Sequence, residues 1–487
     1  MLCYNQESRE AIIVDAREAA PAAATERMFV DQPELSLAGG LSVAVPGEFK
    51  GYWEAHQRYG VLPWKQLFEP AYNIAVDGYV ISKSLESSIV AQEKYIRDDS
   101  GLSTLFLKSD GSLKLEGDIV QNLKLAETLL KISNEGIESF YMGEMATNIA
   151  TEIQQQGGII TAADLANYQI QMKDPLRIQI QDAEGNQLEI LAAPPPSSGV
   201  VGQMIVNIMD AYGYKPGDIE SENQKILMYH RFMEACKFAF SKRAELGDPS
   251  FVDIQNILDD MTSDEFASFI RNTIDDEYVT YENITQYGVE FLNRFDEGTS
   301  HMSVLAPNGD AVAVTSTINN GFGAKFTSPS TGIILNNQMD SFSTPDVRNS
   351  DGIAPSPANF IAPGKRPMSS QSPTLVANQD GSVRLVIGAS GSSKMMTSIS
   401  MVMLKTLMLK QDLRDTVQER RIHHQLSPNY IQNEEDFPQS LLDGLEDKGH
   451  DIEASDRYAV VQSIYKADNG DIYAYSDARK GGQADGY

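Results

Sequence analysis

The sequence contains little cysteine, few basic residues relative to acidic ones, and no hydrophobic run long enough to cross a membrane. Only Cys3 and Cys236 occur among its 487 residues, so no disulfide framework is predicted. Basic residues number 39 against 68 acidic ones, and the formal charge of -29 argues against nucleic-acid binding, which needs a basic face. The best hydrophobic segment, Met395 to Leu409, is too short to span a bilayer and contains Lys405.

The N-terminus also lacks the hydrophobic segment of a signal peptide, because MLCYNQESRE is largely polar. Two adjacent histidines, His423 and His424, have no third ligand near them in the sequence, so no metal site is predicted. What the chain does have is a hydrophobic fraction of 41%, which is ordinary for a soluble globular protein. Its length is enough to bury a large core and corresponds to the mass of about two or three typical domains.

Residues 299–323, TSHMSVLAPNGDAVAVTSTINNGFG, predict a β-hairpin. Hydrophobic residues alternate along both predicted strands, which is typical of a half-buried sheet. Between the strands, Pro307 suits the first corner of a type I turn and Gly309 suits the left-handed position that follows. Together they predict a three-residue loop with a G1 bulge, in which Ala306 faces Asp310.

The same register places Thr299 opposite Thr317, on one face of the hairpin. A threonine hydroxyl is a weak nucleophile and needs an adjacent base. Cleavage between Gly298 and Thr299 would supply that base as a new α-amino group, whose pKa of about 7.7–8.0 leaves part of it neutral near pH 7. From the residues alone, a cross-strand threonine pair that only stabilises the sheet is the alternative interpretation.

Two further groups of residues could bind a carboxylate. Arg17 follows a predicted strand at Ala11 to Val14, and a guanidinium holds a carboxylate through two hydrogen bonds, which lysine cannot copy. A surface ion pair with a nearby acid is the alternative for this arginine. Ser369 and Ser370 could also donate to a carboxylate, although two serines in a proline-rich loop mean little by themselves.

The turn at Gly388 to Ser393 is predicted to join a strand, Val383 to Ile387, to a helix that starts at Met395. Backbone N–H groups at a helix N-terminus point outward, where the helix dipole favours negative charge. Such a turn can form an oxyanion hole, in which one donor is worth about 3–4 kcal/mol in measured cases. A plain turn between a strand and a helix is the alternative.

These segments together resemble the γ-glutamyltransferase family, also called γ-glutamyltranspeptidase or glutathione hydrolase. The resemblance extends from DAREAAP near the start of the chain to SDARKGGQADGY at its end. Asp310 departs from the family pattern, which usually has a small residue there. In the hairpin the matching residues are Thr299, Ser300, His301, Ser303, Val304, Gly309, Val312, Ala313, Thr315, Thr317, Ile318, Asn319, Phe322 and Gly323.

The resemblance implies an α+β protein with the N-terminal-nucleophile hydrolase fold, a four-layer αββα sandwich of two mainly antiparallel sheets between helical layers. It also implies self-cleavage into a large subunit, residues 1–298, and a small catalytic subunit, residues 299–487, which stay intertwined as a heterodimer. Family members usually carry an N-terminal signal or anchor and then a glycine-rich segment, and this chain is expected to lack that portion. An extracellular or cell-surface location is implied by the resemblance alone.

The resemblance further assigns roles to particular residues. Thr299 is the implied nucleophile, Thr317 orients it, and the backbone N–H groups of Gly391 and Ser392 bind the oxyanion. The residues implied to hold the α-carboxylate of a glutamyl group are Arg17, Ser369 and Ser370. The residues implied to hold its α-amino group are Asn319, Gln338, Asp340 and Ser341.

The implied activity is transfer of the γ-glutamyl group of glutathione, or of a related amide, to water, an amino acid or a dipeptide through an ester on Thr299. No metal or organic cofactor is required. Ser341 stands where the family usually has a second aspartate, and a lost charge-assisted hydrogen bond is worth about 1.5–3 kcal/mol. The alternative is therefore a catalytically impaired secreted homologue that binds γ-glutamyl compounds or acts as an interaction protein.

Overall fold

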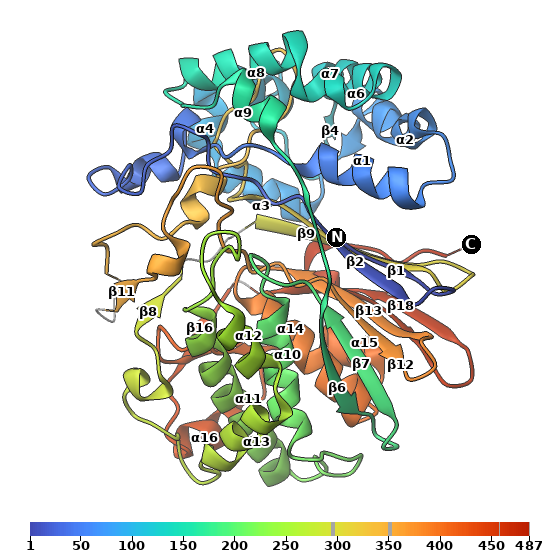
Figure 1. Cartoon of the computed structure of the whole chain (residues 1–487), viewed down its shortest axis with the longest axis vertical. Helices are drawn as coiled ribbons and strands as arrows, with labels where there is room; N and C mark the ends of the chain where they lie inside the picture. The colour runs from blue at the N-terminus through green and yellow to red at the C-terminus, as the bar shows by residue number, and fades with distance from the viewer. Residues whose placement is uncertain (294–297, 349–352, 457, 487) are drawn as a thin grey trace.

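Two β-sheets lie face to face at the centre of the protein, with helices on both sides of the pair (Figure 1). The computed structural model describes residues 1–293, 298–348, 353–456 and 458–486. Its layers run helix, sheet, sheet, helix, so the predicted α+β class and four-layer αββα sandwich are confirmed.

The first sheet has five strands in the order β5-β2-β1-β10-β9, each antiparallel to its neighbours. Strand β9 forms one edge of this sheet, so its outer backbone groups have no strand beside them. The strand bounds are β1 Leu2–Asn5, β2 Glu10–Asp15, β5 Gln171–Lys173, β9 Gly298–Leu305 and β10 Ala311–Asn319.

The second sheet has six strands in the order β18-β17-β13-β12-β7-β6, and all of its pairs are antiparallel. Strand β13 is buried along its whole length, as expected for a central strand packed on both faces. The strand bounds are β6 Leu176–Gln181, β7 Gln187–Ala192, β12 Thr374–Asn378, β13 Val383–Ser390, β17 Val460–Lys466 and β18 Ile472–Ser476.

Apolar side chains from both sheets form the core between them. Leu2 and Ile13 of the first sheet pack in one cluster with Leu191, Leu375 and Val386 of the second, and all five are buried. Full burial of such a side chain contributes about 1.5–3 kcal/mol. This cluster therefore holds the two sheets against each other.

One helical layer covers the first sheet and is built from the N-terminal third of the chain (Figure 1). Strands β3 Tyr79–Val80 and β4 Ile119–Val120 form a small hairpin within it. The helices of this layer are α1 Glu48–Tyr59, α2 Trp64–Asp77, α3 Lys83–Ala91, α4 Glu93–Asp98, α5 Ser100–Phe106, α6 Leu123–Glu135, α7 Glu138–Tyr141, α8 Gly143–Gln155 and α9 Ala162–Asn167.

The other helical layer packs on the second sheet and forms the largest core cluster with it. Its helices are α10 Gly199–Asp210, α11 Glu222–Arg243, α12 Gln255–Thr262, α13 Asp264–Thr273, α14 Lys394–Met403, α15 Leu413–Gln418 and α16 Gln439–Asp447. The short strands near it are β8 Phe291–Leu292, β11 Ala354–Pro355, β14 Ile422–His423, β15 Ile431–Glu434 and β16 Ile452–Ser455.

Both central sheets combine strands from before and after residue 298. In the first sheet, β1, β2 and β5 come before this point, and β10 follows it. In the second, β6 and β7 precede it and the other four strands follow. Neither segment contains all the strands of either central sheet, so the core between these two sheets depends on both segments.

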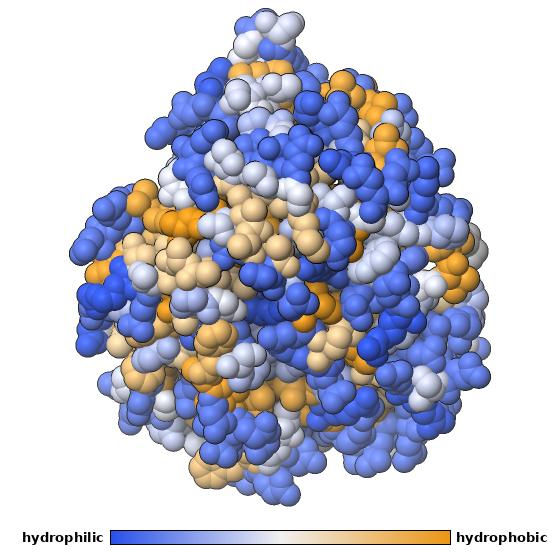
Figure 2. All heavy atoms as spheres, turned by 45° about the horizontal axis from the view of Figure 1, so that its top comes forward, coloured by the Kyte–Doolittle hydropathy of each residue, from blue (hydrophilic) through white to orange (hydrophobic). Residues whose placement is uncertain are grey.

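The described part of the chain has no helix long and apolar enough to cross a bilayer. Cys3 and Cys236 are both buried as free thiols, in agreement with the absence of a predicted disulfide. On the face that Figure 2 shows, hydrophilic residues predominate and hydrophobic residues are scattered among them.

Candidate active site

Strands β9 and β10 form the predicted hairpin, with the predicted loop between them. The N–H of Ala306 donates to the carbonyl oxygen of Asp310 at 2.8 Å, and the N–H of Gly309 donates to that of Ala306 at 2.9 Å. Gly309 has a φ of +93°, the left-handed conformation that the sequence predicts. The loop is thus confirmed, because its turn residues determine it locally.

The strand register agrees with the prediction until Ser316, which lies opposite Ser300. It then shifts by one residue, so that Asn319 lies opposite Gly298. Two residues of β10 therefore oppose one residue of β9, which is a β-bulge. The prediction of a directly opposed Thr299 and Thr317 pair is wrong for this reason.

The bulge aims the hydroxyl of Thr317 at the backbone of Gly298. Thr317 Oγ1 accepts a hydrogen bond from the N–H of Asn319 at 2.9 Å, and Asn319 adopts a φ of +70°. The same hydroxyl donates to the carbonyl oxygen of Gly298. It thus contacts the peptide group between Gly298 and Thr299, although the two threonines are not directly opposed.

The hydroxyl of Thr299 belongs to the residue that follows this peptide group. Thr299 is 7% exposed, and its Oγ1 is buried without a hydrogen-bond partner among the described residues. A buried hydroxyl that makes no hydrogen bond costs free energy of about 1–3 kcal/mol. Such an unpaired group beside a polarised carbonyl suits a nucleophile better than a group that stabilises the sheet.

Arg17 follows β2 and is buried, at 6% exposure. Its Nε donates to the carbonyl oxygen of Pro367 at 3.2 Å, and its Nη2 donates to that of Met368 at 3.1 Å. Its Nη1 lies 3.5 Å from a carboxylate oxygen of Glu18, so part of the predicted alternative, an ion pair with a nearby acid, is also present. The guanidinium fork therefore fixes the loop that leads into Ser369.

Asp15 holds the backbone at Arg17 in place. Its Oδ1 accepts from the N–H of Arg17 at 2.9 Å, and its Oδ2 lies 2.6 Å from Lys173 Nζ and 3.2 Å from Arg366 Nη1. Burial alone would raise the pKa of Asp15, but these two cations hold it below its ordinary value. Asp15 is therefore ionised near neutral pH and anchors this turn.

Ser369 and Ser370 are fully buried in the loop that Arg17 holds. The N–H of Ser369 donates to the carbonyl oxygen of Pro196 at 2.7 Å, and Gln371 Nε2 donates to the carbonyl oxygen of Thr315 on β10 at 2.9 Å. The loop that contains the two serines is thus bonded to Arg17 through Pro367 and Met368, and to β10 through Gln371.

The four residues predicted to hold an ammonium group form one hydrogen-bonded cluster. Gln338 Nε2 donates to Ser341 Oγ at 2.7 Å, and Ser341 Oγ donates to Asn319 Oδ1 at 3.4 Å. Asn319 Nδ2 also lies 3.5 Å from Asp340 Oδ2. Gln338 Oε1 is buried without a partner among the described residues, so the cluster retains an unused acceptor.

The predicted oxyanion turn lies at the end of β13 and leads into α14. Gly391 has a φ of +124° and Ser392 a φ of +60°, so both residues adopt positive φ. Ser393 Oγ donates to Gln425 Oε1 at 2.5 Å, and its side chain makes no cap hydrogen bond with α14. The first N–H groups of the helix are thus not capped by this side chain.

His301 and Gly388 bring this turn's strand against the nucleophile strand. The His301 ring shares hydrogen bonds with Thr315 Oγ1 at 2.8 Å and Ser303 Oγ at 3.1 Å. A Cβ atom on Gly388 would lie 2.1 Å from this ring, so only glycine allows the contact. Burial lowers the pKa of His301 to about 3, so it stays neutral and packs β9 onto β13.

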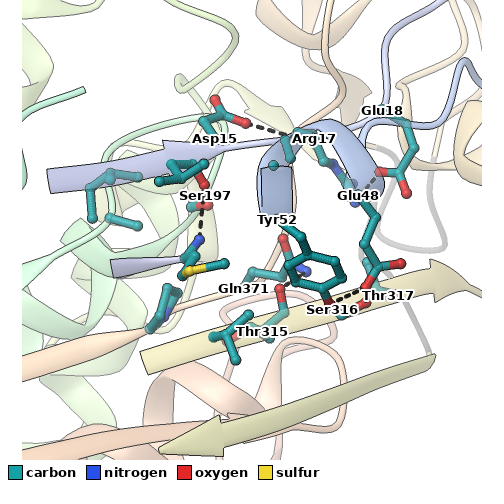
Figure 3. A pocket seen from close by; sticks show the side chains of 18 of the residues that line it. Asp15, Arg17, Glu18, Glu48, Tyr52, Ser197, Thr315, Ser316, Thr317 and Gln371 are labelled. Carbon is teal, nitrogen blue, oxygen red and sulfur yellow. Dashed lines mark hydrogen bonds and ion pairs between the residues drawn. The ribbon is translucent and has the colours of Figure 1, made fainter. Parts of the chain in front are cut away.

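Arg17 and Thr317 line the same cavity, which has a volume of about 80 Å³ (Figure 3). Glu18 and Glu48 also line it, and Ser316 Oγ donates to Glu48 Oε1 at 2.7 Å. A larger and mostly apolar cavity of about 680 Å³ lies between α1, α2 and the outer face of the first sheet. No predicted site residue lines that second cavity.

Sequence reasoning missed Lys480, whose Nζ donates to the carbonyl oxygen of Thr299 at 2.7 Å. Its segment, SDARKGGQADGY, was recognised only as part of the resemblance, and no local pattern connects it with a residue 181 positions earlier. Among the described residues, no cluster of histidine, cysteine and acidic side chains is arranged to hold a metal ion.

The whole chain, residues 1–487, matches the gamma-glutamyltranspeptidase family. The chain belongs to this family. Its relatives include glutathione hydrolase 2 of Arabidopsis thaliana, which is 41% identical over 495 residues that cover 98% of this chain and 83% of the relative. Scoloptoxin SSD14 of Scolopendra dehaani is 38% identical over 488 residues, with 100% and 83% of the two chains covered.

Solved structures support the same fold for this gamma-glutamyltranspeptidase family member. The crystal structure of cephalosporin acylase from Bacillus halodurans aligns with a TM-score of 0.80 over 98% of this chain and 84% of that chain. The two sequences are 22% identical, so this likeness concerns the fold alone. An αββα sandwich is therefore shared at low sequence identity.

Ser392 adopts a φ of +60°, a conformation that favours glycine. A side chain in the left-handed region costs about 1–2 kcal/mol, whereas glycine adopts it without that cost. Ser392 keeps the backbone N–H that the predicted oxyanion site needs, at the expense of local strain. Substitutions at Ser392 therefore change the backbone strain at positive φ while they keep the backbone N–H donor.

We expect Ser392→Gly to raise the free energy of unfolding by up to about 1 kcal/mol, because it removes the strain at positive φ. Ser392→Val should lower it by at least about 1 kcal/mol, because a β-branched residue tolerates positive φ poorly. Ser393→Gly is the control, since Ser393 has a φ of −54° and should lose stability. Thermal unfolding measures all three, and a destabilised Ser392→Gly contradicts the expectation.

Proposed function

We propose that the protein is a γ-glutamyltransferase that transfers the γ-glutamyl group of glutathione and related amides to water, amino acids or dipeptides. One observation carries the proposal: in a gamma-glutamyltranspeptidase family chain, the hydroxyl of Thr317 contacts the carbonyl of Gly298, next to the buried and unpaired hydroxyl of Thr299. This is the arrangement that a threonine needs to cleave its own peptide bond.

The chain is first its own substrate in this proposal. Thr299 Oγ attacks the carbonyl carbon of Gly298, and the hydroxyl of Thr317 stabilises the negative charge that develops on the oxygen. The C–N bond breaks as nitrogen takes up a proton, which leaves an ester between Gly298 and the Thr299 side chain. Water then hydrolyses this ester and gives a carboxylate on Gly298 and the free hydroxyl of Thr299, beside the α-amine that the broken C–N bond released.

The new amine is the base for turnover. It accepts the proton of Thr299 Oγ as that oxygen attacks the γ-carbonyl of the substrate. Thr317 loses its contact with Gly298 on cleavage, and its hydroxyl then serves to orient the nucleophile. The N–H groups of Gly391 and Ser392 are proposed to stabilise the oxyanion, and the γ-glutamyl ester that forms passes its acyl group to water or an amine.

The two charged groups on the α-carbon of the glutamyl group are proposed to bind to different sets of residues. The α-carboxylate goes to Arg17 with Ser369 and Ser370, which the structure ties to one loop. The α-ammonium goes to the cluster of Asn319, Gln338, Asp340 and Ser341, where the unpaired Gln338 Oε1 and the Asp340 carboxylate are acceptors. The substrate's γ-carbonyl would then be presented to Thr299.

After cleavage, residues 1–298 and 299–487 are proposed to stay together as a heterodimer. The support is that each sheet contains strands from both segments and that the core between the sheets uses both. The proposed chemistry needs no metal or organic cofactor. The proposed location, outside the cell or on its surface, rests on the family resemblance.

We expect the purified chain to give two bands on a denaturing gel, and sequencing of the smaller fragment to read Thr-Ser-His-Met from its N-terminus. Thr299→Ala should remain one band, because it lacks the attacking hydroxyl. Thr317→Val should cleave more slowly, because the carbonyl of Gly298 loses its donor. A different N-terminus, or cleavage of Thr299→Ala, would exclude this mechanism.

Arg17→Lys should raise KM for γ-glutamyl-p-nitroanilide by about tenfold or more, because a point charge replaces a planar fork and a charge-assisted hydrogen bond is lost. The matched control is Arg27→Lys, which changes an exposed arginine paired with Asp346. Steady-state kinetics of the cleaved enzyme measure KM for both variants. Equal KM values for the two variants would remove Arg17 from the substrate site.

Ser341→Asp should raise kcat/KM for γ-glutamyl substrates by about tenfold, because a second carboxylate would attract the substrate ammonium. Ser341→Ala is the matched control and should not improve kcat/KM, since it adds no charge. If wild type is already fast and Ser341→Asp changes nothing, Asp340 alone supplies the attraction. The hypothesis that the chain is a catalytically impaired homologue then loses its main support.

A further inference from the structure

A lysine near the C-terminus contacts the residue that we propose as the nucleophile. Lys480 Nζ donates a hydrogen bond to the carbonyl oxygen of Thr299 at 2.7 Å. We propose that Lys480 is a positioning residue that holds Thr299 in place during self-cleavage and afterwards during turnover. This inference rests on the proposed function, because it takes Thr299 as the nucleophile in both steps.

Before cleavage, the two carbonyl groups on either side of the Thr299 Cα are held from different parts of the chain. Thr317, on β10, donates to the carbonyl oxygen of Gly298. Lys480, from the C-terminal segment, donates to the carbonyl oxygen of Thr299. With both neighbouring peptide groups fixed, the Thr299 side chain has less freedom, which favours a constant approach of Oγ to the Gly298 carbon.

After cleavage, only one of these two contacts still acts on Thr299. The carbonyl of Gly298 becomes the carboxylate of another chain, so Thr317 no longer restrains Thr299 through it. Thr299 is then the first residue of β9, which is an edge strand. Terminal residues at such an edge fray unless a further contact ties them down. The hydrogen bond from Lys480 supplies that contact.

Lys480 is itself placed by a network of buried charges. It ends a single helical turn, Ala478–Lys480, that begins at the fully buried Asp477. The Asp477 carboxylate lies 2.7 Å from Arg421 Nη2 and 2.9 Å from Arg479 Nη1, and Arg479 Nη2 lies 2.7 Å from Glu434. Buried and paired charges of this kind hold their geometry firmly, because separating them leaves an unpaired charge.

The same turn connects the two sheets at their edges. It follows β18, the edge strand of the second sheet, and reaches β9, the edge strand of the first. Although Lys480 as a whole is exposed, burial around its ammonium group lowers the pKa of Lys480. Both observations describe a side chain directed at Thr299 rather than one extended into solvent.

The test compares Lys480→Met, which removes the donor, with Lys480→Arg, which keeps one. Lys410→Met is the matched control, because Lys410 is exposed and pairs with Glu184. For each full-length chain, the rate of self-cleavage is followed on denaturing gels and turnover is measured with γ-glutamyl-p-nitroanilide. Thermal unfolding of each variant is recorded in parallel.

We expect Lys480→Met to cleave itself, and then to turn over substrate, about tenfold more slowly, with KM within about twofold of wild type. Lys480→Arg should recover most of the lost kcat, and Lys410→Met should match wild type. We expect the loss in kcat and not in KM because Lys480 contacts the backbone of the proposed nucleophile and not the substrate.

Three results would overturn the inference. An unchanged kcat for Lys480→Met shows that the contact is not needed, and a raised KM with unchanged kcat makes Lys480 a substrate-binding residue. A melting temperature well below that of Lys410→Met makes it a structural residue. If wild type cleaves itself but does not turn over γ-glutamyl-p-nitroanilide, the proposed function fails, and the self-cleavage rates still decide the role of Lys480.

Discussion

The organisation of the site depends on one hydrogen bond, from the hydroxyl of Thr317 to the carbonyl oxygen of Gly298. It exists because a bulge in β10 places two residues opposite one on β9, so that Thr317 meets the backbone before Thr299 rather than its side chain. The bulge, the positive φ of Asn319 and the unpaired Thr299 hydroxyl all belong to this local arrangement. An ideal hairpin would bring the two hydroxyls together and leave the carbonyl without this donor.

If the chain cuts its own backbone as proposed, it must remain folded afterwards, and the sheet topology provides for this. Each sheet joins a block of strands from one segment to a block from the other, so separation of the two segments would break the β1–β10 and β12–β7 pairs and expose the core around Leu2, Leu191 and Leu375. The bond proposed to be cleaved lies at the beginning of an edge strand. Cleavage there would chiefly free Thr299, the residue whose carbonyl oxygen accepts the hydrogen bond from Lys480.

The sequence predicted well those features that neighbouring residues determine. The loop at Pro307 and Gly309 follows from turn chemistry, and the strands of the hairpin follow from their alternation. The bulge was not predictable, because it depends on a contact between Thr317 and Gly298, which a strand pattern does not encode. The layer order came from the resemblance, since periodicity indicates strands without their order. Lys480 was missed because its partner is distant in sequence and is a backbone atom.

The cluster of Asn319, Gln338, Asp340 and Ser341, which is proposed to bind the substrate ammonium, contains one acidic side chain. Ser341 is 1% exposed, and its hydroxyl connects Gln338 with Asn319 without any charge. Asp340 Oδ1 accepts from Ser36 Oγ at 2.6 Å, while its other oxygen faces Asn319. A second carboxylate at residue 341 would add attraction for an ammonium group, but it would also be buried close to Asp340. Two like charges so close repel and disfavour ionisation, so a single acid avoids this repulsion while it attracts an ammonium group less strongly.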